Sequence, residues 1–133
     1  MTVPHNQSNH LSINDIHGIK TGHYTDFDSV TGCTAVLCEA GAVGGVDVRG
    51  GAPGSRETDL LDPTASVPLI HGVVLSGGSA FGLQTVDGAM QYFKNRGIGH
   101  KAGNSRIPIV AGSILFDLSI GLCLLYTSDA ADE

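Results

Sequence analysis

The sequence predicts a domain of the α/β (α+β) class. One long stretch, Ser79 to Arg96, carries apolar residues at helical spacing and follows a short apolar strand. Segments rich in β-forming residues lie before and after it. The chain has 133 residues, 41% of them hydrophobic and 15% charged, which is enough to bury a core. We therefore expect one layered domain in which a sheet packs against a helix.

The first half of the chain is expected to be mainly extended. Residues 13–24 predict two short extended pieces, and residues 31–38 are rich in β-forming side chains and predict a strand. We expect residues 42–49 to return as its hairpin partner, joined through residues 39–41. A Gly/Pro-rich loop should follow. Residues 56–61 then predict a helical turn that ends at the next Asp-Pro pair.

The helix from Ser79 to Arg96 is predicted by an apolar stripe and by signals at both ends. Ser79 is expected to cap its N-terminus, and Gly97 its C-terminus. The stripe consists of Leu83, Val86, Met90 and Phe93. Residues 71–75, before the helix, are almost wholly apolar, which predicts burial of both strand faces. Residues 107–110 and 113–118 predict further strands.

Charge and composition argue against several function classes. The formal net charge of −6 is opposite to that of a nucleic-acid-binding surface, and no apolar run is long enough to span a membrane. The six histidines are scattered without ligand spacing, so we expect no metal and no cofactor. Cys33 and Cys38 should point to opposite faces of one strand, so they cannot form a disulfide. This suits a reducing, cytoplasmic setting.

Both ends of the sequence are expected to lie outside the folded domain. Residues 1–11 are polar and predict disorder. Residues 123–133 show neither strand alternation nor a capped helix, and they resemble the in-frame translation of a sequencing-library transposon adaptor. We interpret them as a non-native tail; an ordinary acidic C-terminus is the alternative. The domain is accordingly assigned to residues 12–122.

The run Gly77-Gly78-Ser79, between the apolar strand and the helix, permits several interpretations. Amides at a helix N-terminus can hold a phosphate, although the glycine spacing does not match the common phosphate loops. A hydrolase nucleophile elbow would need a second glycine where Phe81 stands. Backbone amides could also form an oxyanion or substrate-carbonyl site. The structural alternative is a tight turn with Ser79 as the helix cap.

Three polar features have both a functional and a structural interpretation. Asp47 and Arg49 lie on one face of a predicted strand, where an exposed ion pair is worth about 0–1 kcal/mol. His71 begins the apolar strand, and a hydrogen-bonded structural role is favoured over that of a base. Asp117 follows the last apolar segment; strand ends often carry function, but the residue could simply cap the next turn.

Taken in order along residues 12–122, these segments resemble one family of self-processing hydrolases. It comprises the L-aminopeptidase/D-esterases, the β-peptidyl aminopeptidases and the 6-aminohexanoate-oligomer endohydrolases. The matching motifs are INDIHGIKTGH from Ile13, TGCTAV from Thr31, GVDVRGGAPG from Gly45, RETDLL from Arg56, LSGGSAFGL from Leu75, IPIV from Ile107 and ILFDL from Ile114. Several motifs in the same order are more specific than any single glycine pattern.

The resemblance implies a four-layer α/β/β/α sandwich, of which this chain would supply the N-terminal portion. It also implies a precursor that cuts itself into two subunits, with a Ser or Thr nucleophile at the new N-terminus of the second. The implied substrates are peptides or ω-amino-acid amides, and the implied assembly is a homo-oligomer of paired subunits. No catalytic residue is assigned here: the nucleophile is expected beyond residue 122, in the C-terminal subunit, so this chain alone should be inactive.

Four residues are expected at the substrate site. Phe116 matches a position where some family members have a Tyr that lines the active site, so the resemblance implies an apolar wall there. Gly77, Gly78 and Ser79 are expected to lie near the cleft. Two alternatives remain from other classes. One is a small nucleotide- or metabolite-binding α/β module, suggested by the Gly-Gly turn, and the other is a noncatalytic structural domain.

Overall fold

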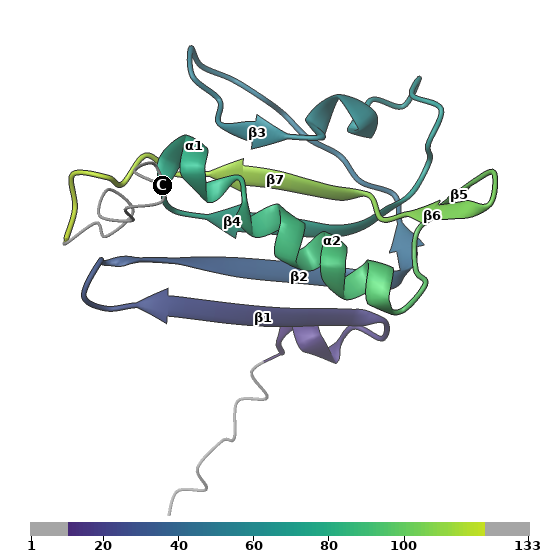
Figure 1. Cartoon of the computed structure of the whole chain (residues 1–133), viewed down its shortest axis with the longest axis horizontal. Coiled ribbons are helices and arrows are strands. Elements are labelled where there is room, and N and C mark those ends of the chain that lie inside the picture. Colours follow the sequence, from purple (N-terminus) through teal and green to yellow (C-terminus); the bar gives the residue numbers. More distant parts are fainter. Residues whose placement is uncertain (1–10, 122–133) are drawn as a thin grey trace, which may run out of the picture.

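In the computed structural model, which describes residues 11–121, a five-stranded sheet carries two helices on one face (Figure 1). The sheet has the order β1-β2-β4-β7-β3, formed by β1 (Ile19–Asp26), β2 (Thr31–Ala42), β3 (Ser55–Arg56), β4 (Ile70–Ser76) and β7 (Val110–Ile114). The other elements are 3₁₀ turns η1 (Ile13–Asp15) and η2 (Thr58–Leu61), helices α1 (Ser79–Gly82) and α2 (Thr85–Asn95), and hairpin strands β5 (His100–Ala102) and β6 (Ser105–Ile107). The predicted α+β class is confirmed.

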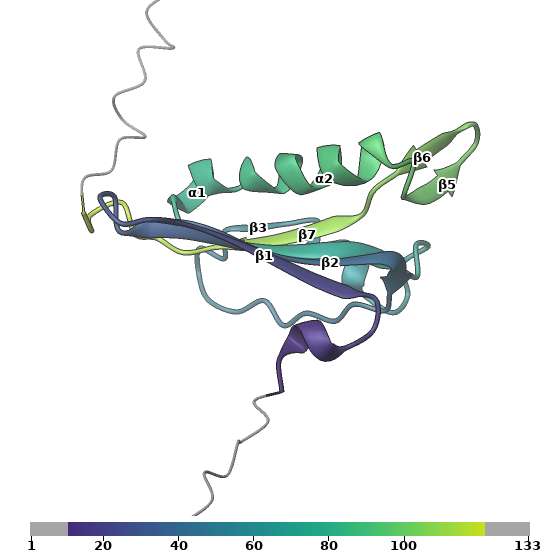
Figure 2. The same cartoon turned by 90° about the horizontal axis from the view of Figure 1, so that it is seen from below.

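The helices connect the one parallel pair of strands in the described sheet. β1 with β2, β2 with β4, and β3 with β7 are antiparallel, whereas β4 and β7 are parallel. A parallel pair needs a crossover connection, and α1 and α2 provide it. Figure 2 shows both helices on one side of the sheet, with the long connection from β2 to β4 running along the other side.

The core lies between α2 and the middle of the sheet. Val86 and Phe93 of α2 are almost completely buried against Val74 of β4 and Val110 of β7. This confirms three members of the predicted apolar stripe, since Met90 packs beside the same cluster. The fourth, Leu83, is the C-cap of α1 and lies outside the cluster. Gly112 of β7 permits the close approach, because a Cβ there would lie 2.5 Å from Val86 Cγ2.

The predicted single helix is wrong at its start and right at its end. Two helices, α1 and α2, replace it, and Ser79 is not an N-cap: Gly78 precedes α1, and both residues have positive φ, +88° and +54°. At the far end Gly97 has φ +65° and terminates α2 as predicted. Its amide bonds Lys94 O at 3.0 Å, and the next amide bonds Phe93 O at 3.0 Å, which is the Schellman arrangement.

The predicted hairpin partner at residues 42–49 is wrong. β2 continues through residues 39–41 to Ala42, which pairs with Ile70 of β4 after a register shift. Gly41 has φ +83° within this shifted segment. Its left-handed backbone thus serves a bulge in a continuing strand rather than a hairpin turn. Residues 43–49 form no strand, while the predicted loop at residues 50–54 is confirmed.

Other boundaries differ in smaller ways. The first predicted extended piece is instead the turn η1, whose N-cap Ser12 forms a capping box with Asp15. The predicted helical turn before the Asp-Pro pair is confirmed as η2. The last strands are displaced: β6 ends where 107–110 was expected to begin, and β7 ends at Ile114 rather than continuing to residue 118.

The prediction that β4 is buried on both faces is also wrong. Leu75 is 50% exposed. It alternates with Val74, which packs in the core under α2, so it lies on the opposite face of the sheet, which carries no helix (Figure 2). The prediction of disorder for residues 1–11 falls outside the described part of the chain except at Leu11, and the prediction of a non-native tail at residues 123–133 falls wholly outside it.

Candidate functional site

The carboxyl end of β4 opens into a cavity of about 510 Å³. Its walls come from the ends of β1 and β2, the β4–α1 turn, the beginning of α2 and the segment after β7. The lining includes Tyr24, Asp26, Thr31, Cys33, Gly77, Gly78, Phe81, Gln84 and Asp117. Ligand sites in sheets with parallel strands favour the carboxyl ends of those strands, so this cavity is the candidate site.

The carboxylate of Asp117 joins two segments that are distant in the sequence. Its Oδ1 accepts a hydrogen bond of 2.7 Å from the Gly78 amide, and its Oδ2 accepts one of 2.7 Å from the Thr31 hydroxyl. A Cβ at Gly77 would overlap both the carboxylate and this hydroxyl. The glycine is therefore required where Asp117 and Thr31 meet, which is a steric reason for part of the Gly-Gly motif.

The amides of the β4–α1 turn are occupied by acceptors within the protein. Gly77 N donates to Gly32 O at 2.9 Å, Gly78 N donates to Asp117, and Ser79 N donates to Leu115 O at 2.9 Å. The Asp117 carboxylate takes the place where a phosphate would have to bind. These three amides consequently do not form the phosphate or oxyanion cradle that the motif permitted, and the nucleotide-binding alternative loses its motivation.

The cavity is electrostatically negative. The hydrogen bond from the Thr31 hydroxyl is the main cause that lowers the pKa of Asp117, and the hydrogen bond from the Gly78 amide lowers it further. Hydrogen bonds from Ser29 are the main cause that lowers the pKa of Asp26, with the Asp28 amide contributing in the same direction. Both carboxylates are therefore ionised near neutral pH. Among the described residues, the lining contains no Lys, Arg or His, and Tyr24 and Phe81 add aromatic surface.

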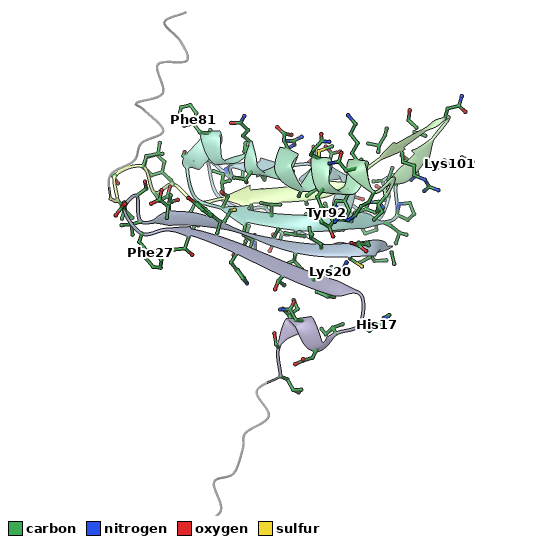
Figure 3. All side chains as sticks on the ribbon, turned by 60° about the horizontal axis from the view of Figure 1, so that its bottom comes forward. His17, Lys20, Phe27, Phe81, Tyr92 and Lys101 are labelled. Atoms are coloured by element: carbon green, nitrogen blue, oxygen red, sulfur yellow. The ribbon has the colours of Figure 1, made fainter. Side chains whose placement is uncertain are left out.

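The structure brings only some of the predicted site residues together. Gly77 and Gly78 line the cavity, and Ser79 follows directly without lining it. Phe116 is 76% exposed and does not line the cavity, so in this structure it forms no wall of it. Its neighbour Asp117 does line the cavity. In Figure 3, Phe81 lies on the helix side and Phe27 in the β1–β2 turn at this same end of the sheet.

The remaining polar candidates have structural roles. His71 is 7% exposed, and its Nδ1 accepts a hydrogen bond of 3.2 Å from Ile109 N. Burial is the main cause that lowers its pKa, so the ring is neutral, as a structural histidine requires. Arg49 and Asp47 form the expected exposed ion pair at 2.7 Å, although not on a strand. Among residues 11–121, no group of His, Cys, Asp or Glu is arranged to hold a metal ion.

Sequence reasoning missed several residues of the cavity. Thr31 and Asp26 flank the β1–β2 turn, and Tyr24 and Cys33 are cross-strand partners beside it. The sequence signal that could have found them is the presence of polar residues at strand ends, which is typical of functional sites. We used this signal for Asp117 but not for Asp26 and Thr31 at the β1–β2 turn. No signal in the sequence predicted the contact between His23 Nδ1 and Thr34 Oγ1, which are 2.9 Å apart. No carboxylate of the described residues is hydrogen-bonded to this imidazole.

Comparison with known proteins decides the family. Residues 11–124 match the model of Peptidase family S58. This chain belongs to peptidase family S58. An uncharacterized aminopeptidase of Mycobacterium leprae is 47% identical over 118 residues, 83% of this chain and 33% of that protein. The 6-aminohexanoate-oligomer endohydrolase of Paenarthrobacter ureafaciens is 28% identical, over 87% of this chain and 30% of its own length.

Membership of family S58 confirms the resemblance recognised in the motifs. A further uncharacterized aminopeptidase, from Mycobacterium tuberculosis, is 45% identical over 83% of this chain and 34% of its own length. The chain thus spans about a third of the length of these S58 relatives. No helix in residues 11–121 has the length and apolar character needed to cross a bilayer.

Proposed function

We propose that this chain is the substrate-binding scaffold of an S58 amide hydrolase that acts on peptides or ω-amino-acid amides with a free amino group. The observation that carries the proposal is the negative cavity at the end of β4. Two ionised carboxylates, Asp26 and Asp117, face a space with aromatic walls, to which residues 11–121 contribute no cationic side chain. An ammonium group on an aliphatic stem is complementary to such a cavity in charge and in polarity.

The nucleophile is proposed to come from a segment outside the described residues. Asp117 holds Thr31 and Gly78 in place, and Nδ1 of His71 accepts the Ile109 amide, so among the described residues no imidazole is hydrogen-bonded to a hydroxyl of this cavity. The resemblance implies a Ser or Thr nucleophile freed by self-cleavage, with its own α-amine close enough to serve as a base. We extend this mechanism, and the assembly of paired subunits into homo-oligomers, to the protein that contains this chain. A cytoplasmic location is likewise proposed.

The test compares this chain with the longest product of its genomic locus. Aminoacyl p-nitroanilides and short β-peptides serve as substrates, and their N-acetylated counterparts serve as controls. We expect turnover by the longer product only, and only of substrates with a free amine. Turnover by residues 1–133 alone would overturn the placement of the nucleophile. Equal turnover of the acetylated substrates would overturn the role of the carboxylates.

Substitutions in the longer product test the two carboxylates directly. Asp26→Asn keeps an oxygen to accept the amides of Asp28 and Ser29, which lie at 3.0 and 2.9 Å, but removes the charge. It should raise KM several-fold with a smaller change in kcat. The matched control is Asp28→Asn, in the same turn but outside the cavity lining. Equal KM values for the two variants would contradict ammonium binding at Asp26.

A further inference from the structure

The cations of this chain are distributed unevenly. Four of its seven Lys and Arg residues, Lys94, Arg96, Lys101 and Arg106, lie within residues 94–106, which contain no Asp or Glu. This stretch carries a formal charge of +4, so the rest of the chain, whose total is −6, carries −10. Among residues 11–121, every other Lys or Arg has a carboxylate within 2.7 Å, whereas these four have no ion pair.

Much of this charge lies on the β5–β6 hairpin. The hairpin forms a separate two-stranded sheet, and all its residues from Lys101 to Ile107 are exposed. It projects beyond the five-stranded sheet next to the end of α2 (Figure 2), and Lys101 lies at its outer part (Figure 3). A two-stranded hairpin of this kind has little stability of its own, because it buries almost no apolar surface.

The pairing within the hairpin places like charges together. Lys101 and Arg106 are direct cross-strand partners, so their side chains stand on the same face. Like charges directly opposite each other destabilise an antiparallel pair. Together with Gly103, Asn104 and Ser105 they line a hollow of about 280 Å³, and no acidic residue of the described chain lines it. Arg106 makes one described contact, from Nη1 to Gly99 O at 3.3 Å, which leaves its other donors available.

We propose that the β5–β6 hairpin is a docking arm that binds carboxylates of a second copy of this chain. Complementary groups are present on the turn η2 and the residues around it. Glu57, Asp59 and Asp62 are exposed there and form no ion pair with any described residue. A carboxylate seated between Lys101 and Arg106 removes their repulsion and forms charge-assisted hydrogen bonds. In a two-fold dimer this contact occurs twice, which doubles its contribution.

A second copy is a better match than a nucleic acid. The basic stretch is short, and the rest of the chain would repel a polyphosphate, since it carries a net charge of −7 even without the three acidic residues of the tail at 123–133. The same negative charge attracts the basic arm of another copy. Electrostatic complementarity of this kind sets the register of an interface and speeds association. The inference concerns assembly and does not depend on the proposed amide hydrolysis.

The test is the association state of the full chain, measured by sedimentation equilibrium at about 20 mM and about 500 mM NaCl, since screening shortens from about 20 to about 4 Å over this range. We expect self-association at low salt that weakens at high salt. Arg106→Glu should weaken it at least about tenfold, because like charges then face each other. The control Arg49→Glu makes the same charge change on an exposed side chain outside the arm. It should leave association nearly unchanged.

A charge exchange identifies the partner surface. Neither Arg106→Glu nor the double variant Glu57→Lys, Asp59→Lys should associate alone, but their mixture should form a heterodimer. Both positions are exposed, and circular dichroism checks that the variants fold; Lys101→Glu replaces Arg106→Glu if that variant does not. The proposal is overturned if the wild-type chain is monomeric at low salt, if Arg106→Glu and Arg49→Glu associate equally, or if the mixture stays monomeric. Binding of inorganic phosphate to Lys101 and Arg106 without self-association would also overturn it, in favour of a free anion.

Discussion

Asp117 and Gly78 are joined by a hydrogen bond of 2.7 Å, from the Gly78 amide to Oδ1 of the carboxylate. This bond attaches the segment after β7 to the turn between β4 and α1, and the Thr31 hydroxyl attaches the same carboxylate to β2. One side chain therefore holds three segments at the mouth of the cavity. Because the hydrogen bonds of the Asp117 carboxylate are charge-assisted, removing this side chain affects the shape of the site as well as the stability of the domain.

Removing the Asp117 carboxylate should destabilise the domain. Asp117→Ala leaves the Gly78 amide and the Thr31 hydroxyl without acceptors, and we expect a loss of about 1–2 kcal/mol, moderated by partial solvent access. Asp117→Asn should lose less, since its oxygen can still accept from Gly78 and its amide can donate to Thr31. Urea denaturation of the two variants measures the difference. Equal losses would indicate that charge, not geometry, dominates.

Acid should weaken the same contact. The pKa of Asp117 is lower in the folded chain than its unfolded value of about 3.9, so its stabilising contribution is complete above that value. The contribution is lost as the pH falls from about 4 through the folded-state pKa. The free energy of unfolding, measured from pH 6 down to about 2.5, should fall less steeply for Asp117→Asn than for the wild type. Parallel curves would contradict this assignment.

His71 should make stability depend on pH in a higher range. Burial lowers the pKa of its imidazole in the fold, so the unfolded chain takes up a proton that the native chain does not. The stabilisation is therefore complete above the unfolded value of about 6.5 and declines as the pH falls below it. His71→Asn keeps an acceptor for Ile109 N and should flatten the stability curve between about pH 7 and 5. His17→Asn, at an exposed histidine, is the control for the substitution itself.

Two glycine substitutions should have opposite effects. Gly77→Ala places a methyl group on the Asp117–Thr31 contact and should destabilise the chain by about 1–3 kcal/mol through overpacking. Gly88 lies in α2, where an added methyl group would meet no atom of another element within 4 Å, so Gly88→Ala should stabilise by about 0.5–1 kcal/mol. Thermal denaturation compares both with the wild type. A neutral Gly77→Ala variant would show that Asp117 can move aside without cost.

Ser79 should prefer replacement by glycine. Its φ of +54° is unfavourable for a residue with a side chain, and no hydrogen bond of its hydroxyl is described within residues 11–121. Ser79→Gly should stabilise the chain by about 0.5–1 kcal/mol. The same change at Ser113, an exposed position in β7 without positive φ, should destabilise it. A loss of stability at Ser79 would mean that its hydroxyl has a partner that offsets the strain.

The sequence was sufficient wherever a short-range pattern coincided with burial. Spacing alone located Val86 and Phe93 in the core, and a glycine after a basic turn located the end of α2 at Gly97. Local pattern failed where a glycine had two possible uses. Gly41 serves a bulge inside β2 instead of a hairpin turn, and Gly78 leads a left-handed pair that prevents Ser79 from capping a helix.

By itself, the sequence determined the α+β class and the family, because ordered motifs and apolar periodicity are properties of the linear chain. Only the tertiary structure decided which groups form the site. Thr31 and Asp117 are 86 residues apart and meet through the packing of β2, β4 and β7. The Asp117 carboxylate also fills the space beside Gly77 and accepts the Gly78 amide. The Gly-Gly motif, which permitted anion binding, therefore binds a carboxylate of the protein itself. No local rule could show this, since the acceptor comes from the far end of the described chain.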